Sequence, residues 1–261
     1  MTTNGIFDGA VSIDGRCASV SIRDGVIAAL SLHDIGSPEP IEAKTTNLIP
    51  GFVDLHIHGA VGIDVNAADA DGLLAVAGFL ARNGVTAWVP TLVPDSDENY
   101  RRVIGEIDRL MEMQAGQAVA QAVGVHYEGV FANEKMCGAL RPEYFKKFAG
   151  SELSTLPRLR SGIHMTTFAP EVEGGIELSA ELTRQGWIAS IGHTRADIER
   201  AVQLCREAGI FLAPTFVSFT PWTTLEGYLD QLSTLLRLRL VEAVPPIQLS
   251  IRLLVPEGSY L

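Results

Sequence analysis

Cysteine is scarce in this sequence, with three among 261 residues. Cys17, Cys137 and Cys205 lie far apart and form no CxxC pair. A disulfide framework or a zinc site made of cysteines needs several thiols at characteristic spacings. The sequence indicates neither of these, and it suits a protein of the reducing cytosol.

Long hydrophobic runs are also missing. No apolar stretch approaches the roughly 18 residues of a membrane-spanning helix. The first residues, MTTNGIFDGA, contain no basic segment followed by an apolar one. We therefore expect neither membrane insertion nor secretion, and we predict a cytoplasmic location.

Clusters of basic residues are absent as well. Acidic residues outnumber basic ones by 31 to 20, and the formal net charge is −11. Nucleic acids and anionic membranes are bound mainly through Lys and Arg side chains, so neither is expected as the main partner. A small soluble substrate fits this charge better.

Residues 1–47 are the first of three parts that differ in pattern. Short runs alternate polar and apolar side chains, and Asp-Gly pairs occur at positions 8–9, 14–15 and 24–25. Period-2 alternation interrupted by such pairs is typical of β-hairpins. This part is therefore predicted to be a small β domain.

Residues 48–211 alternate apolar strand segments with amphipathic helical segments. Helices are expected within residues 69–84, 96–114, 174–186 and 195–209, with strand segments such as VTAWVPTLV and WIASIGHT between them. Repeated βα units predict a parallel sheet with helices outside it, and their number suits a barrel. The predicted fold class is α/β, with an incomplete (β/α)₈ barrel.

Residues 212–261 are rich in leucine and contain no histidine. Apolar residues at helical spacing predict one helix within residues 225–243. The final stretch, from Val244 onward, could at most form a strand. Because an incomplete barrel has an open edge, we expect the leucine-rich helix to lie against it.

Four candidate metal ligands occur where predicted strands end, which is where parallel α/β sheets carry their chemistry. His56 and His58 are two residues apart, so both side chains lie on the same face of a strand, together with Asp54. Glu128 and His193 follow later strands. Imidazole and carboxylate groups are ordinary ligands of Zn²⁺ and Fe²⁺. Together these residues could hold one or two ions.

Each candidate also has a simpler interpretation. The two closely spaced histidines could be core residues that bind no metal, and Glu128 could be a solvated loop carboxylate. His193 precedes Thr194, which is the better candidate for the N-cap of the following helix. His126 and His164 lie inside predicted strands, where we interpret them as hydrogen-bonded core or pocket residues. The coincidence of four candidates at strand ends favours a metal site.

Five segments occur in a characteristic order. They are PGFVDLHIHG with its histidine pair, NGVTAWVPTL with the spacing G-V-T-x-x-x-P-T, GVHYEGVFANEKMCGAL, TTFAPE and SIGHT. The third is similar to a G-x-H-x-E-G-P-F pattern, and the last two resemble A-P-E and G-H-[ST] segments. Together they resemble the amidohydrolase superfamily and, within it, the N-acetylglucosamine-6-phosphate deacetylase family. The resemblance covers about residues 1–210.

This resemblance implies a (β/α)₈ barrel with a small β-sandwich. It also implies a reaction in which N-acetylglucosamine 6-phosphate, a small sugar phosphate, gives glucosamine 6-phosphate and acetate. Glu128 and His193 are then metal ligands, while His56 and His58 belong to a second metal position found in some members. The implied cofactor is a divalent ion, Zn²⁺ or Fe²⁺. A homodimer is left open.

Several positions depart from the family pattern. Ala139 falls where the family contacts the sugar, but Leu140 stands where a substrate-contacting histidine is usual, and Val130 replaces the motif's proline. Where the family has a T-H-x-x-N-A-M segment with a further ligand, this sequence reads LAPTFVSFTPW. Later phosphate-binding residues and the acid/base aspartate have no counterpart, so the catalytic residue is unknown. We therefore expect a C-terminally truncated or frame-shifted chain.

Three functions remain open on this basis. The first is a deacetylase with little or no activity, since losing an acid/base group typically costs about 10²–10⁴-fold in rate. The second is another amidohydrolase, such as a cyclic amidase or deaminase, although those usually lack the segment around Glu128. The third is a non-catalytic remnant that binds metal.

Overall fold

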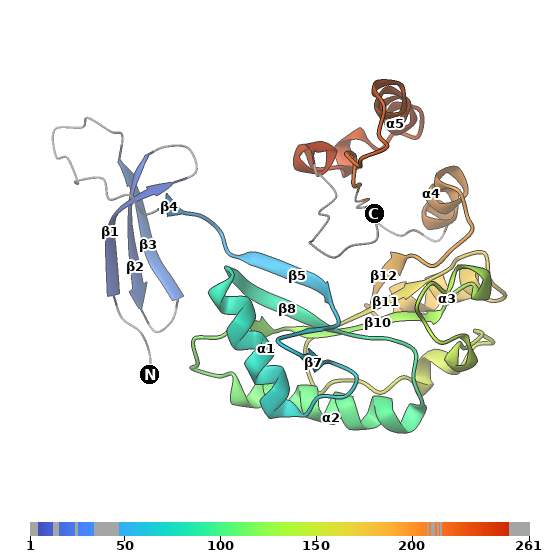
Figure 1. Cartoon of the computed structure of the whole chain (residues 1–261), viewed down its shortest axis with the longest axis horizontal. Helices are drawn as coiled ribbons and strands as arrows, with labels where there is room; N and C mark the ends of the chain where they lie inside the picture. The colour runs from blue at the N-terminus through green and yellow to red at the C-terminus, as the bar shows by residue number, and fades with distance from the viewer. Residues whose placement is uncertain are drawn as a thin grey trace. The chain divides into compact units, whose positions relative to one another are not determined.

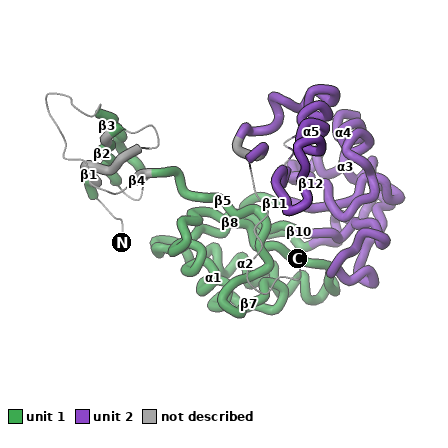
Figure 2. Tube along the Cα trace, turned by 45° about the horizontal axis from the view of Figure 1, so that its top comes forward, with its two compact units in different colours: residues 1–126, 157–164 green, residues 127–156, 165–261 purple. Residues whose placement is uncertain are grey.

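The computed structural model describes residues 5–12, 16–23, 26–33, 47–207, 209, 212, 214 and 216–250. The chain divides into two compact units (Figure 2). Unit 1 comprises residues 1–126 and 157–164, and unit 2 comprises residues 127–156 and 165–261. The three-part division predicted from the sequence, at residues 47/48 and 211/212, stays a prediction.

The elements follow one another along the chain as labelled in Figure 1. The strands are β1 (Gly5–Ser12), β2 (Cys17–Arg23), β3 (Val26–His33), β4 (Asn47–Leu48), β5 (Phe52–Ile57), β6 (Gly59–Ala60), β7 (Ile63–Asp64), β8 (Val85–Leu92), β9 (Gln121–Ala122), β10 (Gly124–Phe131), β11 (Ile163–Phe168) and β12 (Ile188–Ile191). The α-helices are α1 (Ala70–Arg82), α2 (Asp97–Met113), α3 (Gly175–Arg184), α4 (Ile198–Glu207) and α5 (Leu225–Arg237). The 3₁₀ helices are η1 (Glu134–Met136), η2 (Pro142–Tyr144), η3 (Glu152–Thr155), η4 (Val241–Ala243) and η5 (Pro246–Ser250).

The first four strands form one sheet in the order β3-β2-β1-β4, which confirms short antiparallel strands in this part. The predicted turn at Asp8-Gly9 is wrong, because this pair lies inside β1. The register with β2 shifts between Asp8 and Ala10, so Gly9 is the additional residue of a β-bulge. The other two Asp-Gly pairs lie outside the described residues. The resemblance implies a β-sandwich, which has two sheets. The described residues of this part form one sheet.

A second, larger sheet has the order β12-β11-β10-β8-β5, and β9 pairs with β8 beside this path. Pairing is parallel between β5 and β8, β8 and β9, and β11 and β12. This confirms the α/β class and the parallel sheet. Its six strands are fewer than the eight of a closed barrel, as far as the described residues extend. Strand β5 lies at one edge of the order.

Two capped helices of unit 1 pack side by side (Figure 1). The Asp69 side chain accepts a hydrogen bond from the Gly72 N–H before α1, and the Ser96 hydroxyl accepts one from the Asn99 N–H before α2. Each satisfies an N–H that the helix leaves unpaired at its start. Both helices bury an apolar stripe at helical spacing, which positions them beside the sheet. The larger stripe residues are Leu73, Val76, Leu80, Val103, Ile107 and Leu110.

Helix α5 confirms the helix predicted in the leucine-rich region. It packs against α4 through a small cluster, Val202, Leu235, Leu240 and Val244. The final stretch, predicted to form at most a strand, begins instead with the 3₁₀ helix η5, and residues 251–261 lie outside the described part. Every helix among the described residues is too short or too polar to cross a membrane.

Candidate metal centre

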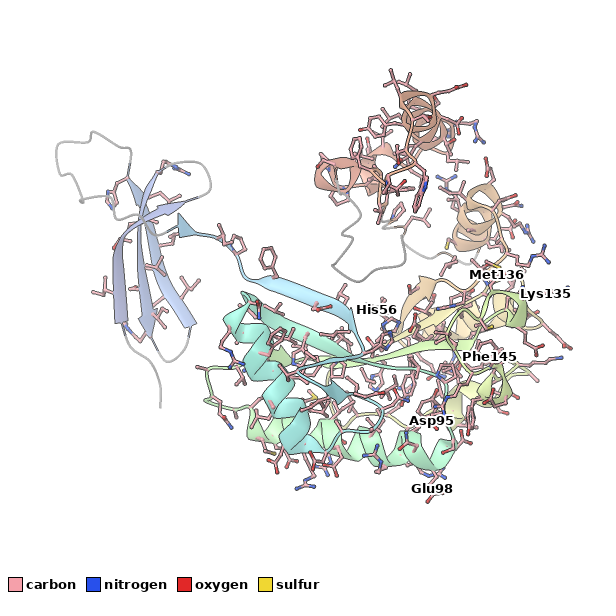
Figure 3. All side chains as sticks on the ribbon, viewed as in Figure 1. His56, Asp95, Glu98, Lys135, Met136 and Phe145 are labelled. Atoms are coloured by element: carbon pink, nitrogen blue, oxygen red, sulfur yellow. The ribbon has the colours of Figure 1, made fainter. Side chains whose placement is uncertain are left out.

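His56 and His58 lie together at the end of β5, where Figure 3 labels His56. Their Nε2 atoms are 3.1 Å apart and both residues are exposed, which confirms that the two side chains share a face. Two nitrogens held about 2.0–2.1 Å from a tetrahedral zinc ion would lie about 3.3 Å apart. The observed spacing therefore suits two rings that bind one ion, and it also suits a hydrogen bond between them.

The backbone that carries this histidine pair is held by side chains. The Asp54 carboxylate accepts a hydrogen bond from the His56 N–H at 3.1 Å, and the Thr91 hydroxyl accepts one from the Ile57 N–H at 3.0 Å. Pairing between β5 and β8 shifts register between Asp54 and Ile57. These two hydrogen bonds thus satisfy backbone donors within the irregular part of the strand.

A third histidine of unit 1 lies beside the pair. His126 is 1% exposed, its ring centroid is 5.1 Å from that of His56, and its Nδ1 is 3.4 Å from the Thr91 hydroxyl. This confirms the interpretation of His126 as a hydrogen-bonded core or pocket residue, and its burial favours the core. His164 is also confirmed as hydrogen-bonded, since its Nε2 accepts from the Leu159 N–H at 3.1 Å.

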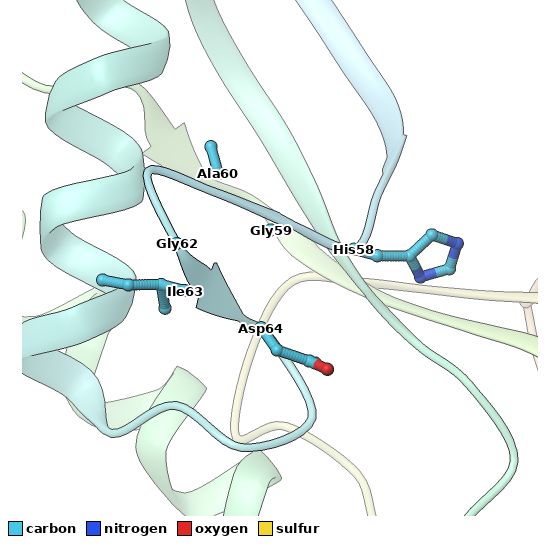
Figure 4. Close-up of a pocket in the computed structure, with 6 residues that line it drawn as sticks. All are labelled: His58, Gly59, Ala60, Gly62, Ile63 and Asp64. Carbon is cyan, nitrogen blue, oxygen red and sulfur yellow. The ribbon is translucent and has the colours of Figure 1, made fainter. Parts of the chain in front are cut away.

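An open depression continues from His58 along the chain (Figure 4). It is lined by His58, Gly59, Ala60, Gly62, Ile63 and Asp64. Gly59 has φ +143, and a Cβ there would lie 1.9 Å from the Ile63 carbonyl oxygen, so this close turn requires glycine. The depression leaves His58 accessible from solvent.

Glu128 and His193 meet within unit 2. Glu128 lies in β10 and is 8% exposed, and its Oε1 is 3.0 Å from Nε2 of His193, which follows β12. His193 Nδ1 is 2.9 Å from the Met136 carbonyl oxygen, which can only accept a hydrogen bond. A hydrogen bond to this carbonyl requires the proton on Nδ1, and Nε2 is turned toward the carboxylate, which when ionised can also only accept. Histidines that bind metals are commonly oriented by such a bond from the other ring nitrogen.

This pair fits a divalent ion. When His193 is neutral, its Nε2 lone pair faces a carboxylate oxygen at 3.0 Å, and a cation bound by both atoms would relieve that repulsion. His56 and His58 of unit 1 also carry imidazole groups. The nitrogen and oxygen atoms of these residues suit Zn²⁺ or Fe²⁺. The residues present thus agree with the metal that the resemblance implies.

The two predicted substrate positions differ in exposure. Ala139 is exposed, whereas Leu140 is buried, with Cδ1 2.2 Å from where a Cβ on Gly129 would lie. Leu140 thus packs against the backbone next to Glu128. A contact between either residue and a sugar stays a prediction.

Sequence patterns missed the residues that hold His193. Besides Met136, labelled in Figure 3, these include Asn133, whose backbone N–H donates to the His193 carbonyl at 3.0 Å. Thr194 was predicted to be the N-cap of α4, which is wrong. The Asp197 carboxylate accepts from the Arg200 N–H at 2.7 Å, so Asp197 caps the helix. The one sequence signal for these supporting residues was the A-P-E segment, because its Glu171 accepts a hydrogen bond from the Thr194 hydroxyl.

Comparisons with known proteins agree with the five ordered segments. No family model matches the chain. N-acetylglucosamine-6-phosphate deacetylase of Mus musculus is 32% identical over 182 residues, which are 67% of this chain and 44% of the relative. N-acetylgalactosamine-6-phosphate deacetylase of Escherichia coli O157:H7 is 32% identical over 181 residues, which are 67% of this chain and 45% of the relative.

Solved structures give a similar picture. N-acetylglucosamine-6-phosphate deacetylase from Thermotoga maritima superimposes with a TM-score of 0.66 at 25% identity, covering 93% of this chain and 56% of that one. This likeness agrees with the predicted barrel class. The chain spans about half the length of the relatives it matches.

Proposed function

We propose that this chain belongs to the N-acetylglucosamine-6-phosphate deacetylases of the amidohydrolase superfamily and is a metal-dependent hydrolase of acetylated amino-sugar phosphates, because of its similarity to such deacetylases. Its reaction would convert N-acetylglucosamine 6-phosphate to glucosamine 6-phosphate and acetate. The observation that carries this proposal is the Glu128–His193 pair, with 3.0 Å between a carboxylate oxygen and an imidazole nitrogen. Both residues come from segments that resemble the family.

Each residue then has a defined task. Glu128 and His193 hold one divalent ion, and His56 and His58 contribute to a second position. A Zn²⁺ or Fe²⁺ ion held there would supply polarisation of the acetyl carbonyl and acidification of a water molecule. The Met136 carbonyl keeps the proton of His193 on Nδ1, so that Nε2 stays available as a ligand.

Ala139 and Leu140 are proposed to lie beside the sugar. Ala139 is exposed and could contact it directly, whereas Leu140 is buried against Gly129 and offers no polar atom. Since a histidine is usual at the place of Leu140, we expect weaker binding of the substrate's polar groups than in the family. A cytoplasmic location fits this metabolic role, and a homodimer stays open.

Activity of the 261-residue chain is expected to be low. A departing amine needs a proton, and the described residues offer no counterpart of the family's acid/base aspartate. Loss of such a group typically costs about 10²–10⁴-fold in rate. The stretch LAPTFVSFTPW also has no histidine where the family has a further ligand. Poor placement of the ion would reduce the rate again.

The test is acetate release from N-acetylglucosamine 6-phosphate and from N-acetylgalactosamine 6-phosphate, with Zn²⁺ or Fe²⁺ supplied. We expect slow turnover that Glu128→Gln abolishes. Glu173→Gln is the matched control, because Glu173 is exposed and pairs with Lys147 at 3.2 Å. Equal turnover by Glu128→Gln would disprove the assigned site. Turnover in the usual range of about 1–10³ s⁻¹ would disprove the expected impairment.

Bound metal without acetate release from either sugar would favour the non-catalytic alternative. Release of ammonia from an aminated ring, or opening of a cyclic amide, would favour another amidohydrolase. Comparing the two acetylated sugars also decides which of them the chain prefers, since relatives named for both are similarly close to it.

A further inference from the structure

Glu171 connects the two loops that surround the Glu128–His193 pair. It follows β11, which lies between β10 and β12 in the order of the sheet. Its Oε1 accepts hydrogen bonds from the Asn133 side-chain amide at 2.9 Å and from the Arg195 N–H at 2.7 Å. Its Oε2 accepts one from the Thr194 hydroxyl. A single carboxylate therefore holds the loop after β10 and the loop after β12.

The charge of Glu171 is consistent with this role. Partial burial raises the pKa of its carboxyl, but hydrogen bonds from Thr194, the Arg195 N–H and Asn133 outweigh burial and lower the pKa below its ordinary value. The group is thus ionised at neutral pH and both oxygens can accept. An amide in the same place would have only one accepting oxygen.

One route from Glu171 to His193 runs through Asn133. With its NH₂ group bound to Glu171, the Asn133 amide presents its oxygen to the Lys135 N–H at 3.0 Å and starts the turn η1. The last residue of that turn is Met136, whose carbonyl receives the proton-bearing Nδ1 of His193. Glu171 thereby orients the amide that begins the turn on which the ring of His193 depends.

A second route acts on the backbone of His193. This residue has φ +49, a left-handed backbone conformation that is uncommon outside glycine and is strained. Such strain persists only when neighbouring contacts hold it. The next two residues, Thr194 and Arg195, are both bound to Glu171, and the His193 carbonyl is bound by the Asn133 N–H.

We propose that Glu171 is a positioning residue that holds His193 in its strained conformation, with Nε2 directed toward the metal position it shares with Glu128. This inference rests on the proposed metal site. Glu171 itself touches neither the ion nor the substrate. It acts through the ring of His193, from both sides of that residue.

Glu171→Gln tests this role because it preserves shape and removes one acceptor and the charge. We expect the affinity of the full chain for Zn²⁺, measured by competition with a chromophoric chelator, to fall by about 10–100-fold, the usual effect of losing such a supporting partner. Glu173→Gln, two residues away and exposed, should leave the affinity unchanged. Unaltered affinity in Glu171→Gln would overturn the proposal.

A double-mutant cycle separates this role from a general loss of stability. If Glu171 acts through His193, adding Glu171→Gln to His193→Ala should reduce Zn²⁺ affinity no further. An equal fall in both backgrounds would overturn the proposal. If His193→Ala alone has no effect, or the unaltered chain binds no Zn²⁺, the proposed metal site fails.

A measurement on the metal-free chain distinguishes failure of the positioning role from failure of the metal site. Nitrogen NMR of the metal-free chain measures the two tautomers of His193, and Glu171→Gln should lower the share that carries the proton on Nδ1. An unchanged tautomer would count against the positioning role whatever the metal result. Should Glu171→Gln not fold, Thr194→Val removes one of the hydrogen bonds, and we expect a loss near the lower end of the range. Unchanged Zn²⁺ affinity there would also overturn the proposal.

Discussion

The two candidate ligand pairs have nearly the same spacing but different support. His56 and His58 are exposed on an edge strand, with 3.1 Å between their nitrogens. Glu128 and His193 are 3.0 Å apart, Glu128 is buried, and the His193 ring and backbone are both hydrogen-bonded to the loop after β10. Ligand spacing alone therefore does not say how firmly a site is formed. We expect Glu128 and His193 to contribute more to metal affinity, because side chains that are already held in place lose less conformational entropy on binding.

The largest expected effect is a loss of Zn²⁺ affinity, which should differ between the two candidate ligand pairs. Loss of a supporting residue typically lowers metal affinity by at most about 100-fold. His193→Ala should lower Zn²⁺ affinity by more than this, because it removes a proposed ligand. His58→Ala should lower Zn²⁺ affinity less than His193→Ala, because His56 and His58 are exposed to solvent. Competition titration measures both, with His33→Ala at the end of β3 as the control. Equal losses at the two positions would contradict the comparison.

A second, smaller effect concerns the glycine next to Glu128. Gly129 has φ +70, and a Cβ there would lie 2.2 Å from Leu140 Cδ1, so Gly129→Ala should lower the free energy of unfolding by about 1–3 kcal/mol. Gly105 in α2 has open space around it, so Gly105→Ala should instead raise it by about 0.5–1 kcal/mol. Urea unfolding measures both variants.

Leu140→Ala combined with Gly129→Ala identifies the cause. Recovery of stability relative to Gly129→Ala alone would assign the loss to the clash with Leu140. No recovery would assign it to the backbone, since φ stays positive in the double variant. If Gly129→Ala proved as harmless as Gly105→Ala, the tight packing beside Glu128 would be wrong.

The smallest effect is a pH dependence in unit 1. Burial, followed by the charge of Arg158, lowers the pKa of His164 from its ordinary value of 6.5. A neutral Nε2 accepts from the Leu159 N–H, so this contribution is complete above pH 6.5 and is lost as the pH falls through the lowered pKa. As the pH falls below 6.5, the thermal midpoint of the unaltered chain should therefore decrease by more than the thermal midpoint of His164→Gln. Parallel curves would contradict it.

Local sequence signals predicted the elements whose stabilising contacts are themselves local. The helices α1 and α2 were predicted because their apolar residues repeat at helical spacing. Their caps are local as well, since Asp69 and Ser96 each accept a hydrogen bond from the N–H three residues later. The turn predicted at Asp8-Gly9 failed because a β-bulge depends on the pairing with β2. The pairing register between β1 and β2 cannot be read from the residues around Gly9 alone.

The sequence by itself determined which candidate ligand types occur and in what order, because metal-binding chemistry depends on side-chain identity and the ends of strands can be predicted from apolar runs. His56 and His58 needed no more than their spacing to share a face. Only the tertiary structure decided how His193 is used. Its left-handed backbone, its bond to Met136 and the diversion of Thr194 from capping to Glu171 all depend on partners more than twenty residues away in the chain. Hydrogen bonds over such separations form only when folding has brought the loops together, so no local pattern could specify them.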